Sequence, residues 1–158
     1  MSIFNEQPYF LDPDFENALV WKCLNSPTFF GTIFKELNPD LLGQPHAKLL
    51  VRAAQIVITT SGRGPASPTI ALARLTELSN SGKLAMSDLD MARAWVKAYK
   101  NDPDATAIDE KAISEEIVPI LKKRMEARAA GQMYNRLGTG GDTRKVVTTL
   151  QAAAVFGL

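Results

Sequence analysis

The sequence has one cysteine, one histidine and almost no net charge, and each shortage excludes a class of protein. Cys23 alone cannot form an internal disulfide or a multi-cysteine metal site. His46 is the only imidazole, so a site that needs two histidines is excluded. The chain has 18 Lys and Arg against 17 Asp and Glu, a formal charge of +1. A protein that coats nucleic acid should be strongly basic instead.

Long apolar runs and strand-like segments are also missing. No segment has the basic start and apolar run of a secretory signal, and no apolar stretch approaches the roughly 20 residues of a membrane span. We therefore expect a cytoplasmic protein with no membrane partner. Residues 57–60 are the only β-favouring run, whereas apolar residues elsewhere recur at helical spacing. The sequence predicts an all-α fold.

The chain is organised around residues 44–84, which predict two helices joined by a turn. Apolar residues between 49 and 57 recur at helical spacing and predict the first helix. The glycines and proline of residues 61–65 must end it, because glycine costs backbone entropy and proline removes a donor. Ser67 and Pro68 favour a new helix, as its N-cap and its first residue.

Further helices are predicted on both sides of this stretch. Residues 12–13 favour a helix start, another helix follows residues 26–27, and Ser87 is expected to cap a third. These helices should form a small globular head over residues 13–101, preceded by a flexible arm at residues 1–12. The core of the head is expected to contain Phe30, Phe34, Leu50, Ile56, Leu75 and Trp95.

Residues 107–158 predict an antiparallel helical hairpin that follows the head. Pro119 should kink or restart its first helix, and a loop at 138–141 should precede its second helix. Two helices share only one seam, so the surplus apolar side chains are expected to pair two chains. The candidate subunit interface consists of Ile117, Leu121, Met125, Met133, Val146, Val147 and Leu150.

Basic side chains of the hairpin form a second candidate site, for DNA or for an acidic partner. They are Lys122, Lys123, Arg124, Arg128, Arg136, Arg144 and Lys145. A solvated helix face explains them without any partner and is the preferred interpretation, and Tyr134 is the only nearby aromatic on which a base could stack.

No cofactor is expected in this chain. The glycines at 138–141 follow no predicted strand and are not closed by the Lys-Ser/Thr pair of a phosphate-binding loop. Cys23 is expected to be a small buried hydrophobe, and His46 a structural residue of a first helical turn. No catalytic constellation is predicted.

The central stretch resembles the N-terminal domain of DnaB-type replicative DNA helicases of bacteria or phages. The resemblance depends on Pro45-His46 followed by Leu49-Leu50, a glycine-containing loop ending at Pro65, a Thr- and Leu-rich helix at 69–75, and a closing Gly82-Lys83-Leu84. The turn and the helical hairpin on either side continue the element order of that family.

This resemblance implies a non-catalytic collar domain that pairs with itself, as a dimer or as a hexamer built from three dimers. The domain would also dock primase or a helicase loader. ATP and magnesium would act only in a separate motor domain that this chain lacks, and DNA would contact the full-length ring of an ATP-dependent helicase. Two alternatives stay open: a stand-alone helicase-loader or adaptor of a phage or mobile element, and a helical DNA-binding regulator. Strong salt dependence of DNA binding would favour the regulator.

Overall fold

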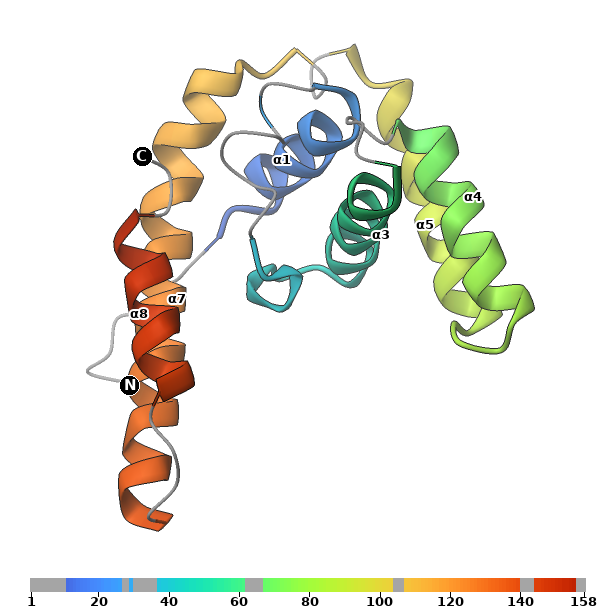
Figure 1. Ribbon diagram of the computed structural model, residues 1–158. Helices are drawn as coiled ribbons and strands as arrows, with labels where there is room; N and C mark the ends of the chain where they lie inside the picture. Colours follow the sequence, from blue (N-terminus) through green and yellow to red (C-terminus); the bar gives the residue numbers. More distant parts are fainter. Residues whose placement is uncertain are drawn as a thin grey trace, which may run out of the picture.

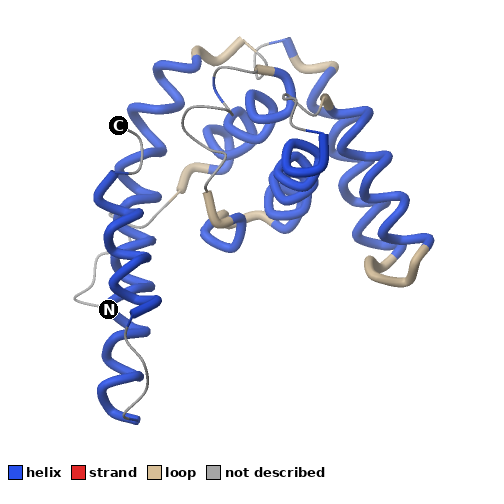
Figure 2. The backbone as a smooth tube through the Cα atoms, viewed as in Figure 1, coloured by secondary structure: helices blue, strands red, loops and turns tan. Residues whose placement is uncertain are grey.

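The computed structural model describes residues 11–26, 29, 37–61, 67–103, 107–139 and 144–155, and over these ranges the fold is all-α as predicted (Figure 2). The elements in chain order are α1 (Pro13–Asn25), the 3-10 helix η3 (Pro39–Leu41), α3 (Pro45–Ser61), α4 (Pro68–Asn80), α5 (Met86–Lys100), α7 (Glu110–Thr139) and α8 (Arg144–Val155). No residue within these ranges lies in a strand, and no helix there is long and apolar enough to cross a membrane.

Two helices begin where the sequence predicts, because their caps are local. The Asp12 carboxylate accepts a hydrogen bond from the Asp14 backbone N–H at 2.8 Å, and Pro13 follows it at the first helical position. The Ser67 hydroxyl likewise accepts from the Ile70 N–H at 3.2 Å. Ser67 has a φ of 58°, a conformation that a non-glycine residue adopts at an energetic cost. Its own N–H donates to the Leu24 carbonyl at 2.8 Å, so the start of α4 is tied to the end of α1.

The predicted cap at Ser87 was wrong, and the restart that was one of two expectations at Pro119 does not occur. The helix predicted after Ser87 begins at Met86, with Ala85 at the N-cap position and no side-chain cap, so Ser87 already lies in the first turn. Pro119 does not restart α7, which runs without interruption from Glu110 to Thr139. Pro119 is exposed, so water can satisfy the carbonyl that its missing N–H leaves free. Its neighbours Ile117 and Leu121 are completely buried and hold the helix in place.

The helices are arranged side by side around α1 and α3 (Figure 1). Helix α3 packs against α1 on one side and against α4 and α5 on the other. Helix α7 packs on α1 and on η3, and α8 returns alongside α7 to complete the antiparallel hairpin that the sequence predicts. The first half of α7 therefore covers one flank of the head, and α4 and α5 cover the opposite flank.

A single apolar core extends through the head into the first half of α7. Leu50 and Leu75 belong to it as predicted, whereas Ile56 and Trp95 are only half-buried. The predicted core residues Phe30 and Phe34 lie outside the described residues, as do residues 1–10 of the predicted arm and glycines 140–141 of the predicted loop. The last two residues of the arm are not flexible as predicted, because Leu11 is 5% exposed and packs in the core and Asp12 caps α1. Gly138 of the predicted loop lies in α7. The completely buried members of the core are Leu19, Val20, Cys23, Leu24, Ala47, Leu50, Val51, Ala53, Ala54, Ala71, Ala92, Ile113, Ile117 and Leu121.

Candidate functional site: the hairpin and the groove on the head

A buried carboxylate joins α1 to the start of α3. Glu16 is 1% exposed, although it lies on the apolar face of α1. Its two oxygens accept hydrogen bonds from the backbone N–H groups of Gly43, at 3.0 Å, and Gln44, at 2.7 Å. These donors precede the first turn of α3, where a negative charge also complements the helix dipole. Glu16 therefore orients α3 on α1. Its carboxylate is buried and both of its oxygens already accept hydrogen bonds from the backbone, so it is not a ligand-binding group.

His46 belongs to a polar and aromatic cluster beside this joint. The Asn17 side-chain oxygen accepts hydrogen bonds from Trp95 Nε1 at 3.2 Å and from Gln44 Nε2 at 3.1 Å. An indole nitrogen can only donate, so the Asn17 atom must be the oxygen, and His46 Nε2, at 2.8 Å from it, must carry a hydrogen. The imidazole also stacks on Trp95, with the ring centroids 5.0 Å apart.

This arrangement gives His46 a structural role, but one that connects three helices rather than the local one predicted. Burial lowers the pKa of His46 below its ordinary value of 6.5 and so favours the neutral ring. Trp95 stacks in turn on Tyr99, at 4.9 Å between centroids. Burial, with smaller contributions from Asp102 and Asp14, raises the pKa of Tyr99 to about 12.

Cys23 is completely buried, as predicted for a small hydrophobe. Burial raises the pKa of its thiol far above the ordinary value, which suppresses the reactive thiolate. Within the described ranges, no three acidic, histidine or cysteine side chains gather in a way that could hold a metal ion.

Three of the residues predicted to form the subunit interface are instead part of the core. Ile117 and Leu121 are completely buried and Met125 is 8% exposed, because this part of α7 packs on α1 and η3. Their regular spacing along α7 correctly marks a buried face, but the partner of that face is the head of the same chain. These three side chains cannot contact a second copy while the fold stays intact.

Arg124 is also part of this contact within the chain. Its guanidinium donates a hydrogen bond of 2.5 Å to the carbonyl oxygen of Leu41, in η3, and its side chain is half-buried. From its place in the sequence, Arg124 was predicted to belong to the basic residues that could contact DNA or an acidic partner. In the structure its hydrogen bond to Leu41 holds α7 against the head.

The rest of the hairpin has a different environment. Ala129 is completely buried and Met133 is half-buried, but Tyr134 is 80% exposed. On α8 every side chain that the structure describes is exposed, and these include Val147 and Leu150 at 43% and 38%. The side chain of Val146 lies outside the described set. Of the candidate interface residues, Val147 and Leu150 therefore remain available for a partner.

The basic residues divide into two groups along the hairpin. Lys122, Lys123 and Arg128 lie on the part of α7 near the head, whereas Arg144 and Lys145 begin α8 at the far end. At 1.5 Å per residue, Lys123 is about 24 Å from the end of α7. The Arg136 side chain lies outside the described residues. The basic set is therefore not one compact patch.

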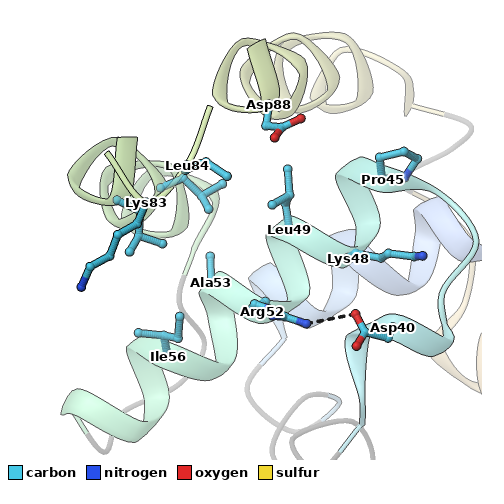
Figure 3. Close-up of a pocket in the computed structure, with 12 residues that line it drawn as sticks. Asp40, Pro45, Lys48, Leu49, Arg52, Ala53, Ile56, Lys83, Leu84 and Asp88 are labelled. Atoms are coloured by element: carbon cyan, nitrogen blue, oxygen red, sulfur yellow. Dashed lines mark hydrogen bonds and ion pairs between the residues drawn. The ribbon is translucent and has the colours of Figure 1, made fainter. Parts of the chain in front are cut away.

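A groove opens on the other flank of the head, between α3 and the α4–α5 pair. Its volume is about 410 Å³, and Figure 3 shows Leu49, Ala53 and Ile56 along its α3 side. Leu75, Leu78 and Leu84 also line it, and its charged rim comprises Asp40, Lys48, Arg52, Lys83 and Asp88. A smaller hollow of about 220 Å³ adjoins it at Ile56.

The helices that line this groove are predicted from the sequence, but the groove itself is not. Apolar residues at helical spacing predict a buried face, and the same spacing describes a face that is only partly covered. Lys48 and Arg52, beside Leu49 and Ala53, were the one available signal, because long basic side chains often border an exposed apolar stripe.

Comparison with known proteins gives no relative: no family model matches the chain, and neither a curated protein nor a solved structure matches it.

Proposed function

We propose that this chain is a non-catalytic self-assembly module, comparable to the collar domain of a replicative DNA helicase, and that two copies pair through the outer part of the hairpin. The observation that carries the proposal is the exposure of large apolar side chains on that part, namely Val147, Leu150 and Tyr134. A contiguous apolar patch on the surface of a folded chain marks a candidate interface.

The geometry of α8 supports pairing with a second copy. Val147, Leu150 and Ala154 are spaced at i, i+3 and i+7, so they lie on one face of the helix, and all three are exposed. The same face on two chains can pack around a two-fold axis, which buries both stripes at once. The comparison with a replicative helicase is supported by the sequence resemblance. The proposed pairing of two chains is supported by the exposed apolar stripe of α8.

The test is sedimentation velocity of the intact chain and of two variants. The unmodified chain should sediment as a dimer or a larger closed assembly at about 50 μM, where a complex of micromolar Kd is mostly formed. Val147→Lys and Leu150→Lys should each shift the chain to monomer, because a lysine in the centre of a paired stripe must be desolvated without a partner. Helical circular dichroism should not change, since both side chains are exposed.

The matched control is Ile70→Lys, which places the same charge on another large exposed apolar residue, in α4 and away from the hairpin. It should leave the sedimentation pattern unchanged. A chain that is already monomeric at about 50 μM would refute the pairing proposal. If Ile70→Lys and Val147→Lys changed the sedimentation pattern equally, the result would show that the chains pair through a surface other than α8.

A further inference from the structure

The groove and the smaller hollow both lie along α3 and share Ile56 in their linings, and we refer to the two together as the channel. Residues 45, 49, 52, 53 and 56 of α3 line the larger groove, and residues 56, 57 and 60 line the smaller one. These positions recur every three to four residues, so they make a single stripe of the helix. The part of the stripe from Lys48, which also lines the larger groove, to Thr60 is about 18 Å long. This is the length of about three helical turns.

The opposite wall comes from α4, which runs antiparallel to α3. Leu75 and Leu78 face the larger groove, and Ile70 and Ala73 face the smaller one. Ile70 is 51% exposed, the one large apolar residue of α4 that solvent reaches so freely. The channel thus has an apolar floor. At its far end lies Ile70, whose exposed side chain another molecule could cover.

The charged rim of the larger groove has a basic surplus. Arg52 pairs with Asp40 at 3.1 Å, as Figure 3 shows. Among the described residues neither Lys48 nor Lys83 forms an ion pair, and they project from α3 and from the turn after α4. Asp88 also lines the groove, but it lies in the first turn of α5, where the helix dipole offsets its charge.

The smaller hollow adds no charge to this balance. Its only charged residues are Arg74 and Glu77, which form an ion pair of 2.8 Å with each other. Lys48 and Lys83 are therefore the charges of the channel that a ligand could neutralise. A ligand with acidic groups beside its apolar face is the electrostatic complement.

We propose that this channel binds an amphipathic helix of about three turns from a partner protein, with leucine-like side chains on one face and acidic residues flanking them. A helix suits the channel because its backbone hydrogen bonds are internal, so the channel need not supply backbone partners. Binding by strand addition would need a sheet edge, and the described part of the chain has none. The helix inserts its apolar side chains between α3 and α4 and places its acids near Lys48 and Lys83. The proposal is independent of hairpin pairing, because the channel and the hairpin lie on opposite flanks of the head.

The test uses a designed, end-capped peptide of about 14 residues, with leucines at i, i+3, i+4 and i+7 and glutamates beside them. It is titrated into the full chain labelled with ¹⁵N, and binding is also measured by fluorescence anisotropy. The largest amide shifts should map to Leu49, Ala53, Ile56 and Ile70. A second peptide with lysines in place of the glutamates should bind about tenfold more weakly.

Two variants and one matched control test the site itself. Lys48→Glu combined with Lys83→Glu should weaken binding by about tenfold, because attraction becomes repulsion at both positions. Ile70→Glu should weaken it by about fivefold without affecting folding, because Ile70 is exposed in the first turn of α4, where an acid is well tolerated. Lys97→Glu combined with Lys100→Glu makes the same charge change on the exposed end of α5 and should change the affinity by less than about twofold.

Val147→Lys should leave peptide binding unchanged, so a failure of hairpin pairing does not affect this result. The proposal is overturned if the acidic peptide shows no saturable binding up to about 1 mM. It is also overturned if the lysine peptide binds as tightly, or if the amide shifts map to the hairpin instead of α3 and α4.

Discussion

Glu16 is a charged residue buried among the apolar side chains of the core. A carboxylate on the apolar face of a helix would be costly to bury if its oxygens had no donors. Glu16 has two, the N–H groups of Gly43 and Gln44, so its charge is used to hold the start of α3. A Cβ at Gly43 would come within 3.2 Å of the carboxylate, so the glycine also gives the acid room.

Replacing Glu16 with glutamine should lower the free energy of unfolding by about 1–3 kcal/mol. Glutamine has one acceptor oxygen where the carboxylate has two, so one of the two backbone donors would face an NH₂ group. Urea denaturation of the two proteins measures the difference. The control is Glu115→Gln, which changes an exposed acid of α7 and should cost less than about 0.5 kcal/mol. Equal losses would mean that Glu16 does not hold α3.

His46 predicts a specific dependence of stability on pH. Burial lowers its pKa in the folded state, so the unfolded chain binds the proton more readily. The neutral ring therefore contributes its full stability above pH 6.5, and this contribution is lost as the pH falls below that value. His46→Gln should make the loss of stability between about pH 7.5 and about pH 5 smaller than in the unmodified chain. Since the chain has no other histidine, the difference between the two profiles isolates this ring. Identical profiles would contradict the assignment.

At the scale of elements, α7 is one continuous helix with two environments. Its first half packs on α1 and η3 and supplies Ile113, Ile117 and Leu121 to the core. Beyond Ala129 the helix has α8 as its neighbour, and Tyr134 is exposed to solvent. A prediction from spacing alone treats the whole apolar stripe of α7 alike, and the structure shows that its large buried side chains lie in the part that faces the head.

Leu121→Ala should therefore lower the free energy of unfolding by about 2–5 kcal/mol, because it removes a completely buried side chain and leaves a cavity. Leu150→Ala is the matched change on α8, where the leucine is 38% exposed, and should cost less than about 1 kcal/mol in the monomer. Thermal or urea denaturation at low protein concentration provides both values. A small effect at Leu121 would show that α7 is not held on the head in solution.

For the whole molecule, the head offers two flanks, and α7 occupies only one of them. The α3–α4 channel on the other flank stays open, and the outer hairpin extends past the head. The two proposed contacts, a second copy at α8 and a partner helix in the channel, therefore use separate surfaces. Arg124 and the buried face of α7 attach the hairpin to the head, whose other flank carries the channel.

Amide hydrogen exchange should show this division. Amides in residues 113–125 should exchange only with global unfolding, because their helix is held by the core of the head. Amides in α8 should exchange much faster in the monomer, because every described side chain of α8 is exposed. Raising the protein concentration should slow exchange in α8 if the hairpins pair, while residues 113–125 stay unchanged. Uniform protection across both regions at low concentration would contradict this view of the hairpin.

The sequence by itself determined the features that depend on neighbouring residues. The all-α class follows from helical spacing, and the starts at Pro13 and Pro68 follow from Asp12 and Ser67, whose caps act over two or three residues. The prediction failed at Ser87, because the helix already begins at Met86. The restart expected at Pro119 as an alternative to a kink does not occur, because Ile117 and Leu121 on either side pack on the head.

Only the tertiary structure decided which apolar faces are covered and which are open. The contacts that decide this join residues far apart in the chain: Glu16 to Gln44 over 28 positions, Asn17 to Trp95 over 78, and Leu41 to Arg124 over 83. Helical spacing shows that a face is apolar, but burial depends on which other helix arrives there. For the same reason Leu121, predicted at an interface between chains, lies in the core, while the channel beside Lys48 and Lys83 became visible only in the folded chain.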